Sequence, residues 1–327
     1  MIVTAMLLSA LLGLGCNNQT KPATEAAAPP PQQQAQPQQP ESVISPMTPL
    51  PVPPNALKIN ADKAWQYNKE VVGFGSRAIN SEGHQKIEQY LKSKLKNDNL
   101  EIDEFTSDSP IGKFTGRNYI AKFPGKKDGI IVIAGHYDTL YNRPKFVGAN
   151  DAGSSTAIPL AIADVLRGRP NDGYSIWLLF TDAEEAFVDW NKNDDNLYGT
   201  KHLAAKWKQD GTAAKIKAFI LVDMLGDKDL DVDEDINSTP WLRKLVYQAA
   251  TDLGYQSHFF QRLNAFEDDH RPFGNIGVPV VDILDIDYGY NGSLHHSDED
   301  TLDKESPKSL EIAGDTVLET VRLLNQQ

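Results

Sequence analysis

The sequence contains almost no cysteine, since Cys16 is the only one in 327 residues. An intrachain disulfide is therefore excluded, and so is a metal site built from several thiolates. The chain has seven histidines and 45 acidic residues. Any metal site is expected to use imidazole nitrogens and carboxylate oxygens.

The sequence also has fewer basic than acidic residues, with 32 Lys and Arg and 45 Asp and Glu, for a net charge of −13. An acidic surface repels phosphate backbones, which argues against a nucleic-acid partner.

The sequence contains no H-E-x-x-H and no G-x-S-x-G motif. Gly73-x-Gly75 follows no predicted strand and has no third glycine at the required offset, so it is not a dinucleotide-binding loop.

Aromatic residues are missing before Trp65, and the chain begins with an apolar run over residues 2–15. Fourteen residues are too few to span a bilayer, which needs about 20, but they suit the apolar region of an export signal. The stretch Leu12–Cys16 resembles a bacterial lipoprotein signal, in which the cysteine becomes lipidated. We expect a signal at 1–16 and an exported protein held on the periplasmic or cell-surface side of a membrane by a lipid anchor on Cys16; an ordinary cleaved signal is the alternative.

Residues 17–55 hold 11 of the 20 prolines and seven glutamines. Such a segment cannot bury enough apolar surface to offset the entropy lost on ordering. We therefore predict a disordered Pro/Gln-rich linker over 17–55 and a catalytic domain over 56–327.

Four continuous apolar runs predict buried strands at 129–135, 174–181, 216–223 and 278–284. Shorter strands are expected at 100–105 and 117–123, and helices at 81–96, 153–167, 197–207, 241–253 and from Pro307 onward. Buried strands that alternate with helices predict a single α/β domain, with a mostly parallel, twisted central sheet flanked by helices. In such sheets the site lies at the carboxyl ends of the strands.

Polar side chains follow each of the four buried runs. His136 ends the first, Glu184 and Glu185 follow the second, Asp223 ends the third, and His296 lies beyond the fourth. Asp151 precedes a predicted helix. Each residue alone has an ordinary structural explanation, such as a helix cap or a solvated face. Together they place nitrogen and oxygen ligands at one edge of one sheet, which predicts a zinc site.

This ordered set resembles the zinc-dependent aminopeptidase clan over about residues 75–327. The resemblance implies a zinc-exopeptidase-like fold with Glu184 as general base. It also implies two metals, one held by His136 and Asp223 and the other by Glu185 and His296, with Asp151 as the bridge.

Four further stretches, at 146–151, 184–190, 197–205 and 268–273, are similar to the glutaminyl-peptide cyclotransferase (glutaminyl cyclase) branch of that clan. This closer resemblance implies peptide or protein N-termini as substrates and a proton shuttled by Glu184. It implies one zinc, held by Asp151, Glu185 and His296. Trp190, Asp223 and Asp268 would line or organise the pocket.

The chemistry favours one zinc, with two still possible. A peptidase needs a metal-activated water, which a second metal helps to hold. Cyclisation of N-terminal glutamine brings its own nucleophile, the α-amine, and a close Asp223–Asp268 pair can share one proton. His136 and Asp223 are both present, so a two-zinc aminopeptidase is the alternative, and a non-catalytic binding protein on the same fold is a third.

The sequence departs from the branch at His295, where a tryptophan usually precedes the last zinc ligand. His295 is expected to contact the substrate or to act as an alternative ligand. The acidic run 227–235 resembles a calcium loop but lacks the glycine and the final glutamate. We expect a solvated loop there, with weak calcium binding as the alternative.

Overall fold

The computed structural model describes residue 42 and residues 45–327. Cys16, the predicted signal and most of the predicted linker lie outside the described residues. Within the described part of the chain, no helix is long and apolar enough to cross a membrane.

The last part of the predicted linker lies against the domain. The backbone N–H of Leu50 donates to Asp252 Oδ1 at 2.6 Å, and Gln248 donates to the carbonyl of Thr48 at 3.0 Å. Met47 packs against the main hydrophobic core. The ordered domain therefore begins before residue 56, because this proline-rich stretch finds hydrogen-bond partners on helix α5 (Pro240–Asp252).

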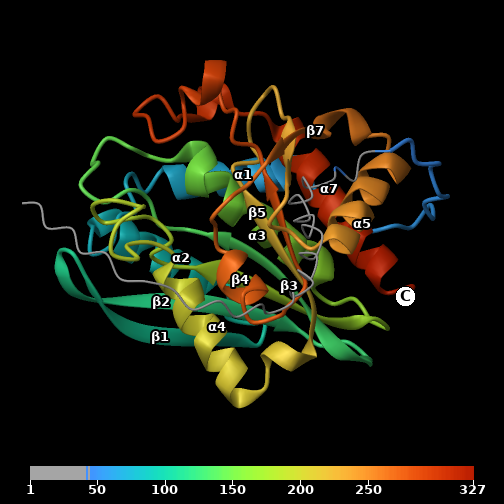
Figure 1. The fold of residues 1–327 in the computed structure, drawn as a ribbon, viewed down its shortest axis with the longest axis horizontal. Coiled ribbons are helices and arrows are strands. Elements are labelled where there is room, and N and C mark those ends of the chain that lie inside the picture. Colours follow the sequence, from blue (N-terminus) through green and yellow to red (C-terminus); the bar gives the residue numbers. More distant parts are fainter. Residues whose placement is uncertain (1–41, 43–44) are drawn as a thin grey trace, which may run out of the picture. The chain divides into compact units, whose positions relative to one another are not determined.

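A six-stranded sheet in the order β1-β2-β4-β3-β5-β8 forms the centre of the domain (Figure 1). The strands are β1 (Leu100–Ser109), β2 (Gly112–Phe123), β3 (Lys127–His136), β4 (Tyr174–Thr181), β5 (Ile216–Asp223) and β8 (Val280–Leu284). β4, β3, β5 and β8 are parallel neighbours, whereas β1 and β2 form an antiparallel edge. The prediction of a mostly parallel sheet is confirmed, and its four parallel strands are the four apolar runs.

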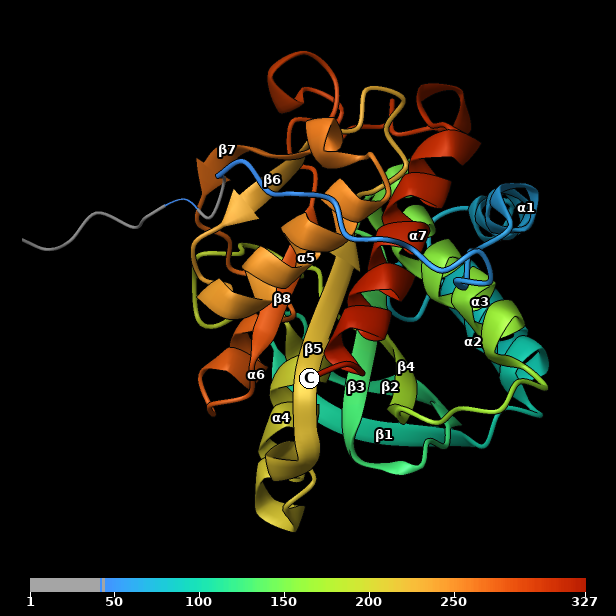
Figure 2. The ribbon, with the colours of Figure 1, turned by 90° about the vertical axis from the view of Figure 1, so that its right-hand side faces the viewer.

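Helices cover both faces of the sheet (Figure 2). One face packs against α1 (Ala61–Val72), α2 (Glu82–Leu95), α3 (Ser155–Leu166), α5 and α7 (Pro307–Leu324), and the other against α4 (Tyr198–Asp210) and α6 (Arg271–Gly274). Side chains of β3 alternate between the two cores, with Ile131 and Ile133 in the first and Val132 and Ala134 in the second. Burial on both faces explains why these strands read as continuous apolar runs.

Local signals in the sequence position two of the helices. The hydroxyl of Ser81 accepts the N–H of His84 at the start of α2, and Ser306 accepts the N–H of Lys308 at the start of α7. Both helices were predicted, at 81–96 and from Pro307 onward. Helix α1 was not predicted, although its cap is of the same kind, with Asn60 accepting from Lys63 at 2.9 Å.

The acidic run 227–235 is not wholly a solvated loop. Its residues Val232–Asp235 form β6, which pairs with β7 (Phe259–Asn264) in a separate two-stranded sheet and is buried. Arg262 of β7 neutralises this strand, with contacts of 3.1 Å to Asp231 and 2.9 Å to Asp233, and it also reaches Asp287 at 2.8 Å. The sequence prediction is therefore wrong here, because it lacked the distant cation that allows the acids to be buried.

A buried arginine fixes the segment between β3 and α3. The Arg77 side chain is fully buried and donates to the carbonyls of Tyr137 at 3.0 Å, Val147 at 2.6 Å and Gly148 at 2.8 Å. Burial lowers its pKa to about 10, although the charges of Asp300 and other nearby acids oppose this shift. The guanidinium group of Arg77 thus connects the beginning of this segment, at Tyr137, with its later part, at Val147 and Gly148.

Replacing Arg77 with methionine is expected to lower the free energy of unfolding by about 3–5 kcal/mol, the scale for removing one partner from a buried charged network. The substitution removes the donor to four carbonyl oxygens, those of Gly75, Tyr137, Val147 and Gly148, and removes a cation from among buried acids. The midpoint of urea unfolding measures the effect. Arg169→Met is the matched control, because Arg169 is exposed and has no ion pair within the described residues; it should change stability by less than about 0.5 kcal/mol. Equal effects of the two substitutions would contradict the role given to Arg77.

Candidate active site

A cavity of about 230 Å³ lies at the carboxyl ends of the parallel strands. It is lined by seven of the residues predicted from the sequence: Asp151, Glu184, Trp190, Asp223, Asp268, His295 and His296. The two other predicted residues, His136 and Glu185, lie beside it, within 3.4 Å of atoms of that set. The structure therefore brings all nine residues to one place.

The turn that carries Asp151 is held by a carboxylate that sequence reasoning missed. Asp300 accepts the N–H of Asn150 at 2.8 Å and that of Asp151 at 3.1 Å, one with each oxygen. Gly148 begins this turn at a φ of 50°, and a Cβ there would lie 1.8 Å from the carbonyl oxygen of Asp151. Asp300 lies only four residues after His296, so its place in the same loop was the signal available.

Two of the predicted metal ligands, Asp151 and Glu185, each lie at coordination spacing from a third, His296. His296 Nε2 lies 3.3 Å from Asp151 Oδ2 and 3.4 Å from Glu185 Oε2. Ligand atoms of a tetrahedral zinc lie roughly 3.3–3.6 Å apart. Asp151 Oδ2 and both oxygens of Glu185 are buried and accept no hydrogen bond. Buried oxygens without donors are costly, so the donor set and its spacing fit a cation such as zinc.

The pKa values of Glu185 and His296 also indicate a site for a cation. Burial and then the charge of Asp151 raise the pKa of Glu185 to about 8. Burial alone would lower the pKa of His296, but its close contact with the Asp151 carboxylate and the charge of Glu185 raise it to about 9. A divalent cation would reverse both shifts, because it favours ionised carboxylates and a neutral imidazole.

The second group of predicted ligands has more contacts within itself, although His136 Nδ1 is buried without a hydrogen-bond partner among the described residues. His136 Nε2 lies 3.2 Å from Asp151 Oδ1 and 3.2 Å from Asp223 Oδ1. Ser155 donates to Asp223 Oδ1 at 2.5 Å. Burial opposes protonation of His136, yet the charge of Asp223 and hydrogen bonds to neighbouring carboxylates raise its pKa well above the ordinary value. A protonated His136 can therefore supply the positive charge that these carboxylates need.

Glu184 and Glu185 point to different places, although they are adjacent. Glu184 lines the cavity, whereas Glu185 faces His296. Asp138 fixes the pair by accepting the N–H of Glu184 at 3.1 Å and that of Glu185 at 3.2 Å. Burial and the charge of Asp268 raise the pKa of Glu184 well above its ordinary value, against the opposing charge of His136. Glu184 is thus a buried carboxyl that can hold a proton beside the cavity.

Asp268 is the second buried carboxyl group that can hold a proton beside the cavity. Burial, and next the charge of Asp223, raise the pKa of Asp268 well above its ordinary value. A proton on Asp268 would relieve the repulsion between the two acids. The next residue, Asp269, was missed by the sequence analysis; it is buried and accepts hydroxyl hydrogen bonds of 2.5 Å from Thr181 and Thr200. Asp269 thereby ties the Asp268 loop to β4 and α4.

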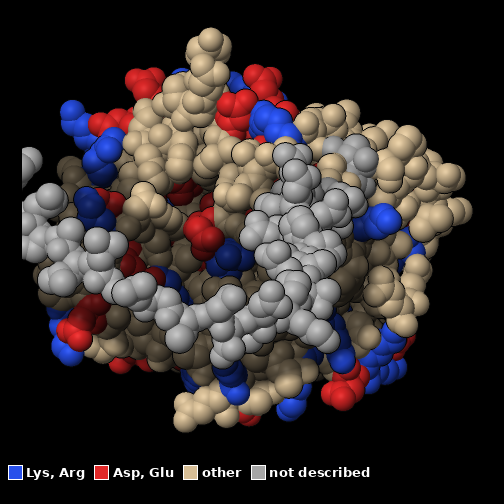
Figure 3. Space-filling model, in the orientation of Figure 1, with Lys and Arg blue, Asp and Glu red and all other residues tan. Residues whose placement is uncertain are grey.

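Acidic groups also dominate the other buried polar positions. Figure 3 shows Asp and Glu side chains inside a hollow of the face drawn, with basic side chains beside them. Among the described residues, four groups of histidine and acids have ligand atoms within 4.8 Å of one another. One of these groups, Asp235, His270 and Asp282, includes the last residue of the run 227–235, and none of the four contains two acids of that run.

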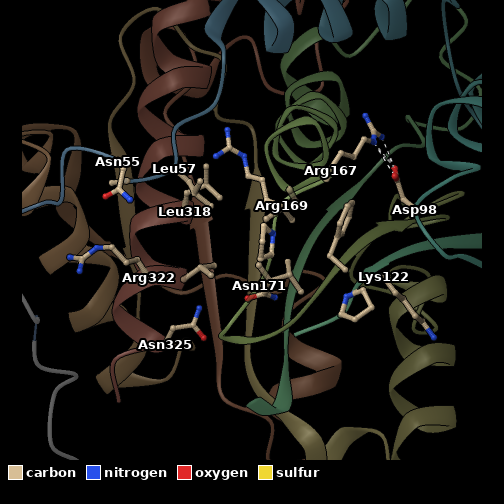
Figure 4. A pocket seen from close by; sticks show the side chains of 18 of the residues that line it. Asn55, Leu57, Asp98, Lys122, Arg167, Arg169, Asn171, Leu318, Arg322 and Asn325 are labelled. Carbon is tan, nitrogen blue, oxygen red and sulfur yellow. Dashed lines mark hydrogen bonds and ion pairs between the residues drawn. The ribbon is translucent and has the colours of Figure 1, made fainter. Parts of the chain in front are cut away.

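A larger cavity of about 870 Å³ lies at the opposite edge of the sheet, between the ends of α3 and α7 (Figure 4). Its wall combines apolar residues such as Leu57 and Leu318 with arginines, and Arg167 is paired there with Asp98. None of the four histidine–acid groups of the described chain lies in it. Size alone would therefore select the wrong cavity for metal chemistry.

Comparisons with known proteins agree with this geometry. Residues 118–321 match the model of peptidase family M28. A glutaminyl cyclase structure from an Acidobacteriales bacterium is 47% identical with a TM-score of 0.80, over 86% of this chain and 99% of that one. The glutaminyl cyclase of Porphyromonas gingivalis is 27% identical with a TM-score of 0.72, over 81% and 98%. The glutaminyl-peptide cyclotransferase of Drosophila melanogaster is 28% identical over 68% of this chain and 70% of its own.

The family match covers more than half of the chain, and the bacterial structure is covered almost completely at high identity. The resemblance inferred from the sequence is therefore confirmed. The chain belongs to peptidase family M28 and, within it, to the glutaminyl cyclase branch.

Proposed function

We propose that this protein is a zinc-dependent glutaminyl-peptide cyclotransferase, which converts an N-terminal glutamine of a peptide to pyroglutamate and releases ammonia. One observation carries the proposal. Buried oxygens of Asp151 and Glu185 that accept no hydrogen bond within the described chain lie at a small cavity, next to two buried carboxyl groups, Glu184 and Asp268, that can hold protons. The similarity to glutaminyl cyclases supports the same reaction.

Asp151, Glu185 and His296 would hold the zinc, which would polarise the γ-carbonyl of the substrate glutamine. The attacking α-amine belongs to the same residue, so the cavity has only to fix its orientation. Glu184 lines the cavity and is placed to accept a proton from that amine and to pass it to the departing ammonia. Trp190, which also lines the cavity, offers an apolar wall that excludes water.

A two-metal aminopeptidase is the second candidate, because His136, Asp151 and Asp223 also form a buried group of possible ligands. His136 already lies within hydrogen-bonding distance of Asp223 in that group. The contacts of Asp223 with His136 and Ser155 reduce its need for a metal, which favours one zinc and hence a reaction that needs no second metal to hold a water molecule.

Incubation of the protein with a Gln-initiated and a Leu-initiated peptide distinguishes the two candidates. Cyclisation removes one ammonia from the first peptide and leaves its length unchanged, whereas a peptidase shortens the second peptide by one residue. We expect only the first change, detected by mass spectrometry. Shortening of the Leu-initiated peptide would make the protein an aminopeptidase.

Metal content tests the ligand assignment. Asp151→Ala, Glu185→Ala and His296→Ala should each lose most of the bound zinc, because a site with two remaining protein ligands binds weakly. If the protein is a one-zinc cyclase, His136→Ala should keep one zinc per chain. His202→Ala, remote from the cavity, is the control. Elemental analysis of the purified proteins gives the result, and full zinc in all three ligand variants would refute the assignment.

Glu184→Gln keeps the shape of the side chain and removes its proton-accepting oxygen. It should retain zinc but lower kcat roughly 100-fold or more, with a smaller change in KM, because the proton moves only in the reaction step. Glu267→Gln is the matched control, since Glu267 lines the same cavity but is exposed and pairs with Arg271. Near-normal turnover by zinc-loaded Glu184→Gln would exclude Glu184 as the proton carrier.

A further inference from the structure

The two adjacent histidines 295 and 296 both face Asp151. Neighbouring residues of an extended chain point to opposite sides. Here His296 has a left-handed φ of 53°, and the two imidazole rings lie with their centroids 3.8 Å apart. The turn at His296 thus brings both rings to the same side of the chain.

The loop that carries these histidines is fixed to the turn that carries Asp151. Tyr288, earlier in the loop, is buried and donates to Asp300 Oδ1 at 2.9 Å. The same Asp300 holds the backbone of Asp151. Arg143 adds a second tie, because its side chain donates to the carbonyl of His296 at 3.1 Å. The position of His295 relative to Asp151 is therefore built into the fold.

His295 lies within reach of the proposed metal. Its Nε2 is 4.0 Å from Asp151 Oδ2, an oxygen that has no hydrogen-bond partner. Ligand atoms of Asp151, His295 and His296 all lie within 4.8 Å of one another. The His295 side chain is 32% exposed, whereas that of Glu185 is 3% exposed. The His296 side chain is 38% exposed as well, so both imidazoles lie toward the open side of the site, where a substrate would enter.

We propose that His295 is a fourth protein ligand of the zinc in the substrate-free enzyme, through Nε2, and that the substrate takes its place. A catalytic zinc usually has three protein ligands and one open position. In this chain the imidazole of His295 would occupy the fourth position while no substrate is bound. It would move away from the metal when the substrate binds. The exchange forms and breaks only coordination bonds. The proposal rests on the proposed zinc site and cyclase function.

The test compares His295→Phe with the wild-type protein in two measurements, neither of which requires turnover. Phenylalanine keeps an aromatic ring against His296 and removes the ligand nitrogen. Competition with a chelator should show a zinc Kd at least about 10-fold higher. In the cobalt-substituted protein, the visible absorption of the substrate-free form should change in intensity and position, because one nitrogen ligand is lost. His202→Phe is the matched control, since His202 also stacks on an aromatic ring, that of Phe105, but lies outside the cavity.

An unchanged zinc Kd together with an unchanged cobalt spectrum in folded His295→Phe would overturn the proposal and leave His295 as a stacking residue. If His295→Phe does not fold, His295→Gln is measured in the same two ways with the same expectations. Failure of the cyclase function is a separate outcome. In that case the wild-type protein binds zinc but leaves the Gln-initiated peptide unchanged, while the effect of His295→Phe on zinc binding still stands.

Discussion

Burial of many carboxylates at one edge of the sheet is the constraint on which the rest of this structure depends. Asp138, Asp151, Glu184, Glu185 and Asp268 are all nearly inaccessible to water and lie around one buried histidine, His136. Such a concentration of negative charge is stable only with cations, protons or hydrogen-bond donors near it. The fold supplies donors through backbone N–H groups and His136, and protons through raised pKa values. The remaining deficit falls at Asp151 and Glu185, where a metal fits.

Most of the fold could be predicted from the sequence because its signals are local. A strand buried on both faces must be apolar throughout, so β4 and β5 were predicted at their observed limits. Ser81 and Ser306 marked helix starts in the same way. The strand β6 was missed for the opposite reason. Its acids become compatible with burial through cations on other elements, since Arg262 of β7 pairs with Asp233 and Arg243 of α5 pairs with Glu234. No local pattern in the sequence identifies these partners.

The site could be predicted at the level of its ligands but not of their supports. Parallel strands bring their carboxyl ends to one edge, so residues that end or follow strands had to meet there. Asp138, Asp269 and Asp300 act through backbone and hydroxyl hydrogen bonds, which depend on loop conformations. Arg77 is similar, because its three carbonyl partners come from a loop that lies 60 or more residues away. Each of these contacts is defined only once the tertiary structure exists.

The order of the ligands along the chain has a consequence for biogenesis. Asp151 and Glu185 belong to the first half of the domain, whereas His296 and the supporting Asp300 lie just before the final helix α7. A growing polypeptide therefore carries an incomplete set of these residues until His296 has been synthesised. Closure of so long a loop is entropically costly, and a metal held by residues at both ends of it would offset part of that cost. A metal held by this set would thus bind late, and it would tie the C-terminal part of the domain to the loops that carry Asp151 and Glu185.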